Sequence, residues 1–219
     1  MIGLLAQNPI TFIVVAILLI VVISIHEFAH AFVADRLGDP TPKLAGRLTL
    51  HPLAHLDPIG TLLIFIAGFG WGKPVPFDPF NLKNPRRDAA LISLAGPFSN
   101  ITMAIVGALV YRFMEWIPFI VFGPLVVEVV STFIYFNVLL AVFNLIPVHP
   151  LDGFKVVGGI LPQRHYHEWM ELERYGMIFL LLLILPIFGS APVVNLINPI
   201  VSFILRILLP QSGSAGGVI

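Results

Sequence analysis

Two histidines and a glutamate follow an apolar run without charge, in the stretch "SIHEFAHAF" of residues 24–32. His26 and His30 are four residues apart, so on a helix both imidazoles lie on one face, one turn apart. That spacing lets both reach a single Zn²⁺ ion. Glu27 is rotated by about 100° from His26, and it can act as a general base toward a water held by the metal. The pattern predicts metal binding rather than a polar contact between helices, because unpaired polar groups in hydrocarbon cost several kcal/mol.

A catalytic zinc site has three protein ligands and one open position, so a third ligand is needed. Asp152, in "FNLIPVHPLDGF", is the first candidate. Prolines and a glycine break the helix around it, and a carboxylate at membrane depth is tolerated where it is buried in protein or lines a wet cavity. Glu128, in the middle of a predicted helix, and Asp57 are weaker rivals.

The other histidines are predicted to have structural or solvated positions. The stretch "HPLAHLDP" contains His51, His55 and Asp57 and imitates a second metal site, but a proline between the two histidines interrupts any helix there. We therefore expect a structural role for this stretch. His165 and His167 lie in a polar, Glu-rich connector and are expected to be solvated.

Composition indicates that membrane helices position these residues. The chain has 219 residues, of which 58% are hydrophobic and 11% are charged, whereas soluble domains have about 25% charged residues. The formal net charge is zero and no basic stripe carries interleaved aromatics, which excludes a nucleic-acid partner. Cysteine is absent, so disulfides and thiol nucleophiles are excluded. We expect an integral, multi-pass membrane protein in the lipid bilayer.

The apolar segments predict an all-α polytopic membrane protein with a bundle of five to six transmembrane helices. Residues 1–210 are expected to form one transmembrane domain and residues 211–219 a disordered tail. Spans are expected over residues 10–37, 89–113, 119–145, 176–188 and 193–209. Residues 59–69 are too short for an upright span, so they form a re-entrant loop or continue into their flanks. Partial alternation over residues 44–50 predicts a small membrane-associated β element.

Basic residues give part of the orientation. The first eight residues contain none, whereas Arg36, Lys43 and Arg47 follow the first span. The far end of that span, near the active site, is therefore expected to face the cytoplasm across the cell (plasma) membrane. Four basic residues after Phe69 conflict with a simple crossing by the preceding apolar segment.

The pairing of "HEFAH" with "NLIPVHPLDG" resembles the site-2 protease family of intramembrane zinc metalloproteases. The family's second signature is N-x-x-P…D-G, and a third shared element is a G-P-x-x-N pattern that opens the middle core helix. The positions that match these two patterns are Asn144, Pro147, Asp152 and Gly153, and Gly96, Pro97 and Asn100. Together the three motifs cover about residues 10–160.

The resemblance implies a zinc endopeptidase that hydrolyses a peptide bond in or near the transmembrane segment of membrane-protein substrates, as in regulated intramembrane proteolysis. His26, His30 and Asp152 would bind one zinc ion, and Glu27 would activate water. Asn144 would position the scissile peptide or stabilise the oxyanion.

The chain departs from the family pattern in two ways. Phe154 stands where most members have glycine, and there is no room for a PDZ or CBS domain, which makes this a compact form. The expected β element resembles the family's membrane-associated sheet, whose edge can pair with an unwound substrate. The Pro- and Gly-rich residues 68–85 are a candidate gate, and His149 is a second candidate oxyanion donor.

Two other functions are compatible with the residues. One is a membrane zinc protease whose third ligand is a glutamate on a later helix and which cuts soluble or prenylated substrates; Asp152 and its context argue against it. The other is a non-catalytic zinc-binding membrane protein; the intact Glu27 argues against it, because zinc binding alone needs no base.

Overall fold

The computed structural model describes residues 7–67, 70–116, 123–186 and 191–209. The helices found there are α2 (Pro9–Leu37), α3 (Thr41–Leu44), η1 (Pro52–Ala54), α4 (Pro58–Ala67), η2 (Pro79–Asn81), α5 (Pro85–Trp116), α6 (Pro124–Asn144), α7 (Asp152–Ile160), α8 (Gln163–Glu171), η3 (Leu172–Tyr175), α9 (Gly176–Ile184) and α10 (Pro192–Leu208). In these ranges the β pairing is one isolated antiparallel bridge between Leu56 and Gly72. The described part of the chain is thus all-α, as expected.

Within the described ranges, three helices are long and apolar enough to cross a membrane: Pro9–Leu37, Pro85–Met114 and Leu125–Asn144. They correspond to the first three predicted spans. The larger count of five to six spans is not confirmed, because α9 has 9 residues and α10 has 17. The predicted tail lies outside the described residues.

Local signals fix the ends of α2. The side chain of Asn8 caps the helix by accepting a hydrogen bond from the Thr11 N–H at 3.1 Å, and Pro9 supplies a first-turn residue that needs no hydrogen-bond acceptor. Gly38 ends the helix with a left-handed φ of 104°. The 29-residue helix therefore carries residues 26–30 well past its middle.

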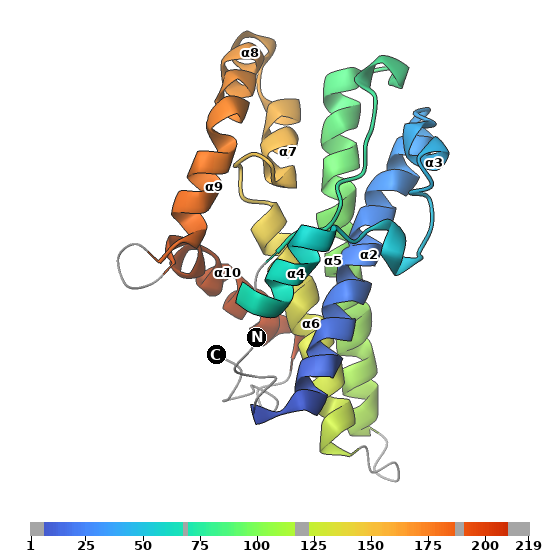
Figure 1. Cartoon of the computed structure of the whole chain (residues 1–219), viewed down its shortest axis with the longest axis vertical. Helices are drawn as coiled ribbons and strands as arrows, with labels where there is room; N and C mark the ends of the chain where they lie inside the picture. Colours follow the sequence, from blue (N-terminus) through green and yellow to red (C-terminus); the bar gives the residue numbers. More distant parts are fainter. Residues whose placement is uncertain (1–6, 68–69, 117–122, 187–190, 210–219) are drawn as a thin grey trace.

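Helix α5 occupies the centre of the molecule and contacts α2, α6 and α7. In Figure 1, α2 rises, α5 descends and α6 rises again, so that neighbouring spans are antiparallel. The end of α2 and the start of α5 lie at the upper end of this view, and the end of α5 and the start of α6 lie at the lower end. Asp152 follows α6 at the point where the chain turns into α7.

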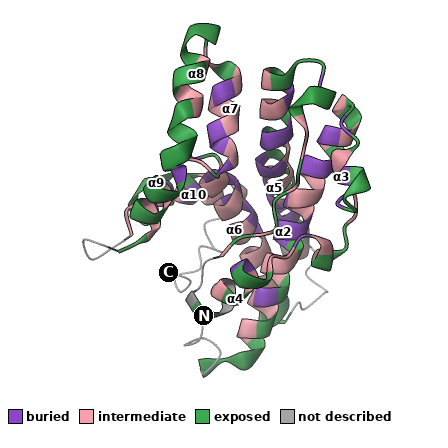
Figure 2. Ribbon diagram, turned by 45° about the horizontal axis from the view of Figure 1, so that its top comes forward, coloured by how far each residue is buried: buried purple, intermediate pink, exposed green. Residues whose placement is uncertain are grey.

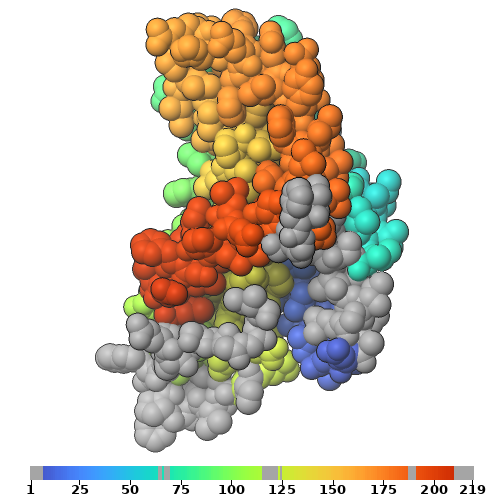
Figure 3. All heavy atoms as spheres, turned by 90° about the vertical axis from the view of Figure 1, so that its left-hand side faces the viewer, coloured from blue at the N-terminus to red at the C-terminus, as the bar shows by residue number. Residues whose placement is uncertain are grey.

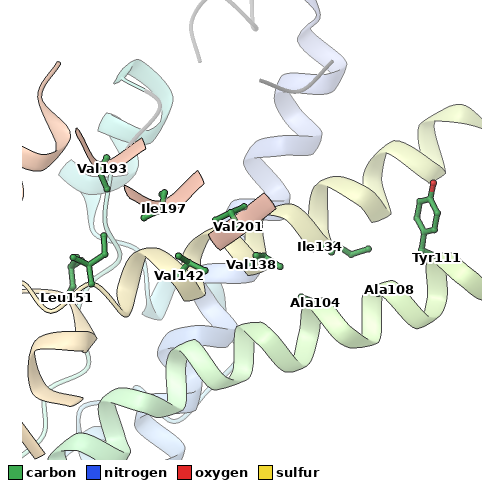
Figure 4. Packing of buried hydrophobic residues seen from close by; sticks show 11 residues of the cluster. Ala104, Ala108, Tyr111, Ile134, Val138, Val142, Leu151, Val193, Ile197 and Val201 are labelled. Atoms are coloured by element: carbon green, nitrogen blue, oxygen red, sulfur yellow. The ribbon is translucent and has the colours of Figure 1, made fainter. Parts of the chain in front are cut away.

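A hydrophobic cluster holds α5, α6 and α10 together (Figure 4). Small residues of α5 face branched residues of α6, which lets the two backbones approach closely. The buried members are Ala104, Ala108 and Tyr111 of α5, Ile134, Val138 and Val142 of α6, Val193, Ile197 and Val201 of α10, and Ile146 and Leu151 of the connecting segment. Helix α10 thus packs against α6 as a short apolar helix.

Buried residues gather on the faces of α2, α5, α6 and α7 that turn toward one another, whereas α8 and α9 are mostly exposed (Figure 2). Large apolar side chains cover the outside of the spans, among them Ile13 and Ile17 of α2 and Leu109 and Phe113 of α5. Such a surface is suited to lipid, since soluble monomers rarely expose large contiguous apolar patches. Viewed from the side, α8, α9 and α10 lie in front of α6 and α7 (Figure 3).

The strand expected over residues 44–50 does not form. Residue 44 ends α3, and the residues after it adopt turns and bends. The reason is Arg47, which is 3% exposed and donates hydrogen bonds to the carbonyls of Ala54 and Lys73. A side chain that binds two separated backbone segments holds this stretch as a loop, so the partial alternation reflects burial of single residues.

The chain segments before and after helix α4 lie next to each other. The Leu56–Gly72 bridge and the hydrogen bond from the Lys73 N–H to the His55 carbonyl, at 2.8 Å, join the two sides of its base. Trp71 also lies against the first turn of α4, because a Cβ at Gly60 would come within 2.1 Å of the Trp71 carbonyl oxygen. The segment around α4 therefore returns to its starting side, which agrees with the re-entrant expectation rather than with a crossing.

Candidate metal centre

His26, His30 and Asp152 meet in space. The two Nε2 atoms are 3.0 Å apart, and Asp152 Oδ2 lies 3.1 Å from His26 Nε2 and 3.3 Å from His30 Nε2. Four ligands about 2.0–2.1 Å from zinc at tetrahedral angles are about 3.3 Å apart. The three atoms thus form a triangle of the size that one face of a zinc site requires. Among the described residues this is the single group of three such side chains able to hold a metal ion.

The chemistry of the donor atoms fits a metal as well. Asp152 Oδ2 is buried and has no hydrogen-bond partner within the described part of the chain. His30 Nδ1 donates to the Ile92 carbonyl at 2.7 Å, and His26 Nδ1 lies 2.5 Å from Asn100 Oδ1. Protonation of both Nδ1 atoms would leave both Nε2 atoms with a free lone pair beside the unpartnered carboxylate oxygen, which is the donor set that a shared metal ion requires.

Two glycines let other backbones approach these ligands. A Cβ at Gly96 of α5 would lie 2.5 Å from His26 Cε1 and 2.5 Å from His30 Nε2. A Cβ at Gly153 would lie 2.3 Å from the Leu145 carbonyl oxygen. The glycines of both matched patterns are therefore explained by close packing, the first against the histidines and the second against the end of α6.

Glu27 follows His26 on α2 and is half-buried. Its Oε1 would be 3.4 Å from a Cβ at Gly72, so the base of the α4 segment lies directly beside it. Arg47 is near enough to interact electrostatically: burial lowers the pKa of its guanidinium, and the Glu27 carboxylate works in the opposite direction. Glu27 thus follows His26 on α2 and interacts electrostatically with a buried cation.

Asn144 is the last residue of α6, and its amide donates to the Leu140 carbonyl of the same helix at 3.0 Å. Its predicted role toward a substrate stays a prediction. His149, the other candidate donor, pairs with Glu173 Oε1 at 3.6 Å. The gate proposed for residues 68–85 lies partly outside the described residues.

The remaining polar candidates have other surroundings. Glu128 is exposed. Asp57 accepts a hydrogen bond from the Gly60 N–H at 2.8 Å and so caps α4, and the fully buried His55 bonds to the Thr49 carbonyl at 2.7 Å. His165 and His167 are exposed. The positions of His55 and Asp57 agree with the structural role expected for their stretch, and those of His165 and His167 agree with the solvated positions expected for them.

Asn137 is the residue that sequence reasoning missed. It is 0% exposed, and its Oδ1 accepts a hydrogen bond from Asn100 Nδ2 at 2.9 Å. The available signal was an amide in the middle of an otherwise apolar span, since intramembrane polar residues are costly and mark functional positions.

Comparison with known proteins places these residues in a family. The model of peptidase family M50 matches residues 120–187. YwhC of Bacillus subtilis, described as a candidate zinc metalloprotease, is 41% identical over 179 residues, which are 80% of this chain and 81% of YwhC. Rip2 of Mycobacterium tuberculosis, described in the same way, is 32% identical over 80% of this chain and 66% of Rip2. The zinc metalloprotease MJ0392 of Methanocaldococcus jannaschii is 27% identical over 73% of this chain and 38% of its own length.

No solved structure matches the chain. Three findings support one assignment: the extent of the similarity to YwhC, the zinc-sized triangle of donor atoms and the apolar spans. The chain belongs to peptidase family M50, the site-2 protease family, and is a membrane metalloprotease with zinc as its cofactor.

Proposed function

We propose that this chain is an intramembrane endopeptidase that hydrolyses a peptide bond in or near the transmembrane segment of other membrane proteins. The observation that carries the proposal is the depth of the donor triangle. His26 lies 17 residues after Pro9 on α2, which is about 26 Å along a helix axis, whereas the hydrocarbon core is about 30 Å thick. A substrate bond that reaches this site enters the protein at membrane depth.

In the proposed reaction His26, His30 and Asp152 hold the zinc ion. Zinc supplies Lewis-acid activation of water and of the substrate carbonyl when it is bound. Glu27 accepts a proton from the water while the water oxygen bonds to the carbonyl carbon of the substrate. Glu27 then gives this proton to the leaving amine as the carbon–nitrogen bond breaks. Water is thus divided between the two products, and Glu27 is regenerated.

Asn144 is proposed to bind the backbone of the substrate. It stands where α6 ends and the chain turns toward Asp152, so its side chain is close in sequence to a metal ligand and belongs to a broken segment. A substrate helix hides its peptide groups in its own hydrogen bonds, and an amide that offers both a donor and an acceptor can replace them once the helix unwinds.

The test measures zinc content and cleavage of a single-span membrane substrate with the purified full-length protein. We expect wild type to hold about one zinc ion per chain and to cut. The Glu27→Gln variant should hold zinc and lose more than 100-fold of the cleavage rate. The Asp152→Ala variant should lose both zinc and cleavage. Asp35→Asn, on the same helix, is the matched control and should retain both.

Other outcomes would favour the alternatives. Cleavage of soluble or prenylated peptides with no cleavage of the single-span substrate would indicate a different substrate class. Wild type that holds zinc and cuts neither substrate would indicate a non-catalytic metal-binding protein. If Asp152→Ala kept both zinc and activity, the proposed ligand set would be wrong.

A further inference from the structure

A line of buried polar side chains crosses all three long helices. It runs from the Phe133 carbonyl through Asn137 on α6 and Asn100 on α5 to His26 on α2. Asn137 Nδ2 donates to the Phe133 carbonyl at 2.9 Å, and Asn100 Nδ2 donates to Asn137 Oδ1 at 2.9 Å. Asn100 Oδ1 lies 2.5 Å from His26 Nδ1. Both asparagines are 0% exposed, so water does not compete for these groups.

The direction of this line follows from its first member. The Phe133 carbonyl can only accept hydrogen bonds, so Asn137 must turn its NH₂ group toward it and its oxygen toward Asn100. Asn100 must then donate through its own NH₂ group, which leaves its oxygen for His26. That oxygen can only accept, so His26 carries its proton on Nδ1 and presents the Nε2 lone pair.

We propose that Asn137 is a positioning residue for the metal site: it fixes the orientation of the Asn100 amide and, through it, the tautomer of His26 that binds zinc. The inference rests on the proposed ligand role of His26. If Asn100 turned over, its NH₂ group would face Nδ1, and the ring would have to move its proton to Nε2, the atom in the donor triangle. Partners of metal-bound histidines typically contribute about 10–100-fold to metal affinity.

The first test is the zinc dissociation constant of the full-length protein, measured by competition with a chelator. The Asn137→Leu variant keeps the shape of the side chain but neither accepts from Asn100 nor donates to Phe133, and we expect it to weaken zinc binding by about 10-fold. Asn137→Asp also keeps the shape. Its buried carboxyl, protonated toward the Phe133 carbonyl, preserves the direction of the line, so zinc binding should stay within about twofold of wild type.

Val138→Ala is the matched control for packing. Val138 neighbours Asn137 on α6 and is also 0% exposed, so its truncation leaves a cavity in the same region and lowers the thermal midpoint. We expect its zinc dissociation constant to be unchanged. If Asn137→Leu behaved like Val138→Ala, losing thermal stability with unchanged zinc affinity, Asn137 would be a structural residue and the proposal would fail.

The second test needs no folded variant of Asn137. In metal-free wild type with ¹⁵N-labelled histidine, the His26 ring should be protonated at Nδ1 and unprotonated at Nε2, with the signals assigned by their loss in His26→Gln. A proton on Nε2 would overturn the proposal. Failure of the ligand assignment is distinguishable, because His26→Ala would then retain zinc whatever the tautomer in wild type.

Discussion

At the scale of single residues, Gly96 is the position next to the donor triangle that has no space for a larger side chain. A Cβ there would approach both histidine rings to about 2.5 Å, closer than real Cβ contacts, and the α5 backbone cannot retreat because it also packs against α6. We expect Gly96→Ala to lower zinc affinity by at least about 10-fold and to lower proteolysis with it. Chelator competition and a cleavage assay with the purified protein measure the two effects.

Gly107→Ala, on the same helix, is the control for that substitution. Its Cβ would meet the Ile134 side chain at 2.9 Å. An aliphatic side chain can shift to make room, whereas the His26 and His30 rings next to Gly96 are held in place by their own contacts. This variant should lose some thermal stability and retain zinc. Equal loss of zinc in both variants would mean that α5 packing in general, rather than contact with the histidines, supports the site.

That His26, His30 and Asp152 lie together could be predicted from the sequence, because two of them are local and the third stands in an unusual segment. The spacing of His26 and His30 follows from helix geometry alone, and Asp152 was indicated by a carboxylate in a broken apolar segment. The role of Asn137 could not be predicted in the same way. Its partner depends on which face of α6 meets α5, and that is decided by the packing of Ile134 and its neighbours against small residues of α5.

At the scale of elements, Arg47 determines how the segment between α2 and α5 is held. Its guanidinium binds the carbonyls on the two sides of the α4 base. Arg47→Met keeps the length of the side chain and removes both hydrogen bonds, leaving two carbonyls unpaired. We expect a loss of about 2–4 kcal/mol in the free energy of unfolding, measured by titration with a denaturing detergent, together with faster cleavage of residues 54–73 by an added soluble protease.

The exposed Arg87 gives the matched control, because Arg87→Met removes an arginine from the first turn of α5, just after the same segment. A surface substitution of this kind should change stability by less than about 0.5 kcal/mol. Should Arg47→Met leave both the stability and the protease pattern unchanged, the base of α4 would be held by the Leu56–Gly72 pairing alone.

Asp39 makes the same segment sensitive to acid. Burial alone would raise the pKa of its carboxyl, but hydrogen bonds from Thr41, Asn81 and the Asp78 N–H outweigh it and hold the pKa below its ordinary value of 3.8. A folded-state pKa below the unfolded one stabilises the fold fully above the unfolded pKa, and this contribution is lost as pH falls through the folded pKa.

The expected result is a thermal midpoint that is lower in Asp39→Asn than in wild type by about the same amount at pH 7 and pH 5. The difference should shrink as the pH falls below 3.8, because the unfolded chain and then the folded wild type take up a proton at this carboxylate. The loss at neutral pH should be about 2 kcal/mol. A difference that already shrank between pH 7 and pH 5 would show that the pKa is raised instead.

The fold could be predicted from the sequence where apolar length decides it, and less well where tertiary contacts do. The first three spans were predicted because their apolar runs exceed the thickness of the bilayer. The prediction of a strand over residues 44–50 was wrong, because alternation of apolar and polar residues does not show that Arg47 binds two distant carbonyls. The later span predictions assumed uninterrupted helices, whereas η3 and the end of α9 divide that region into short pieces.

At the scale of the whole molecule, the return of the α4 segment explains why basic residues occur both before and after it. Because the α4 segment comes back to its starting side, the basic residues before and after it lie at one end of the bundle. All Lys and Arg residues except Arg112 and Arg206 fall between the last turn of α2 and the first turn of α5, or between α6 and α9. From the positive-inside rule we expect this upper end of Figure 1 to face the cytoplasm.

Cysteine labelling tests this orientation, because the natural chain contains no cysteine and a single introduced thiol is unambiguous. Lys83→Cys places a thiol at the upper end, just before α5, and Gly123→Cys places one at the lower end, where no atom of the described residues lies within 4 Å of a new Cβ. We expect a membrane-impermeant maleimide to label the Gly123→Cys variant in intact cells and the Lys83→Cys variant only after the membrane is opened. The reverse pattern would contradict the expected orientation and would place His26, His30 and Asp152 nearer the outer surface.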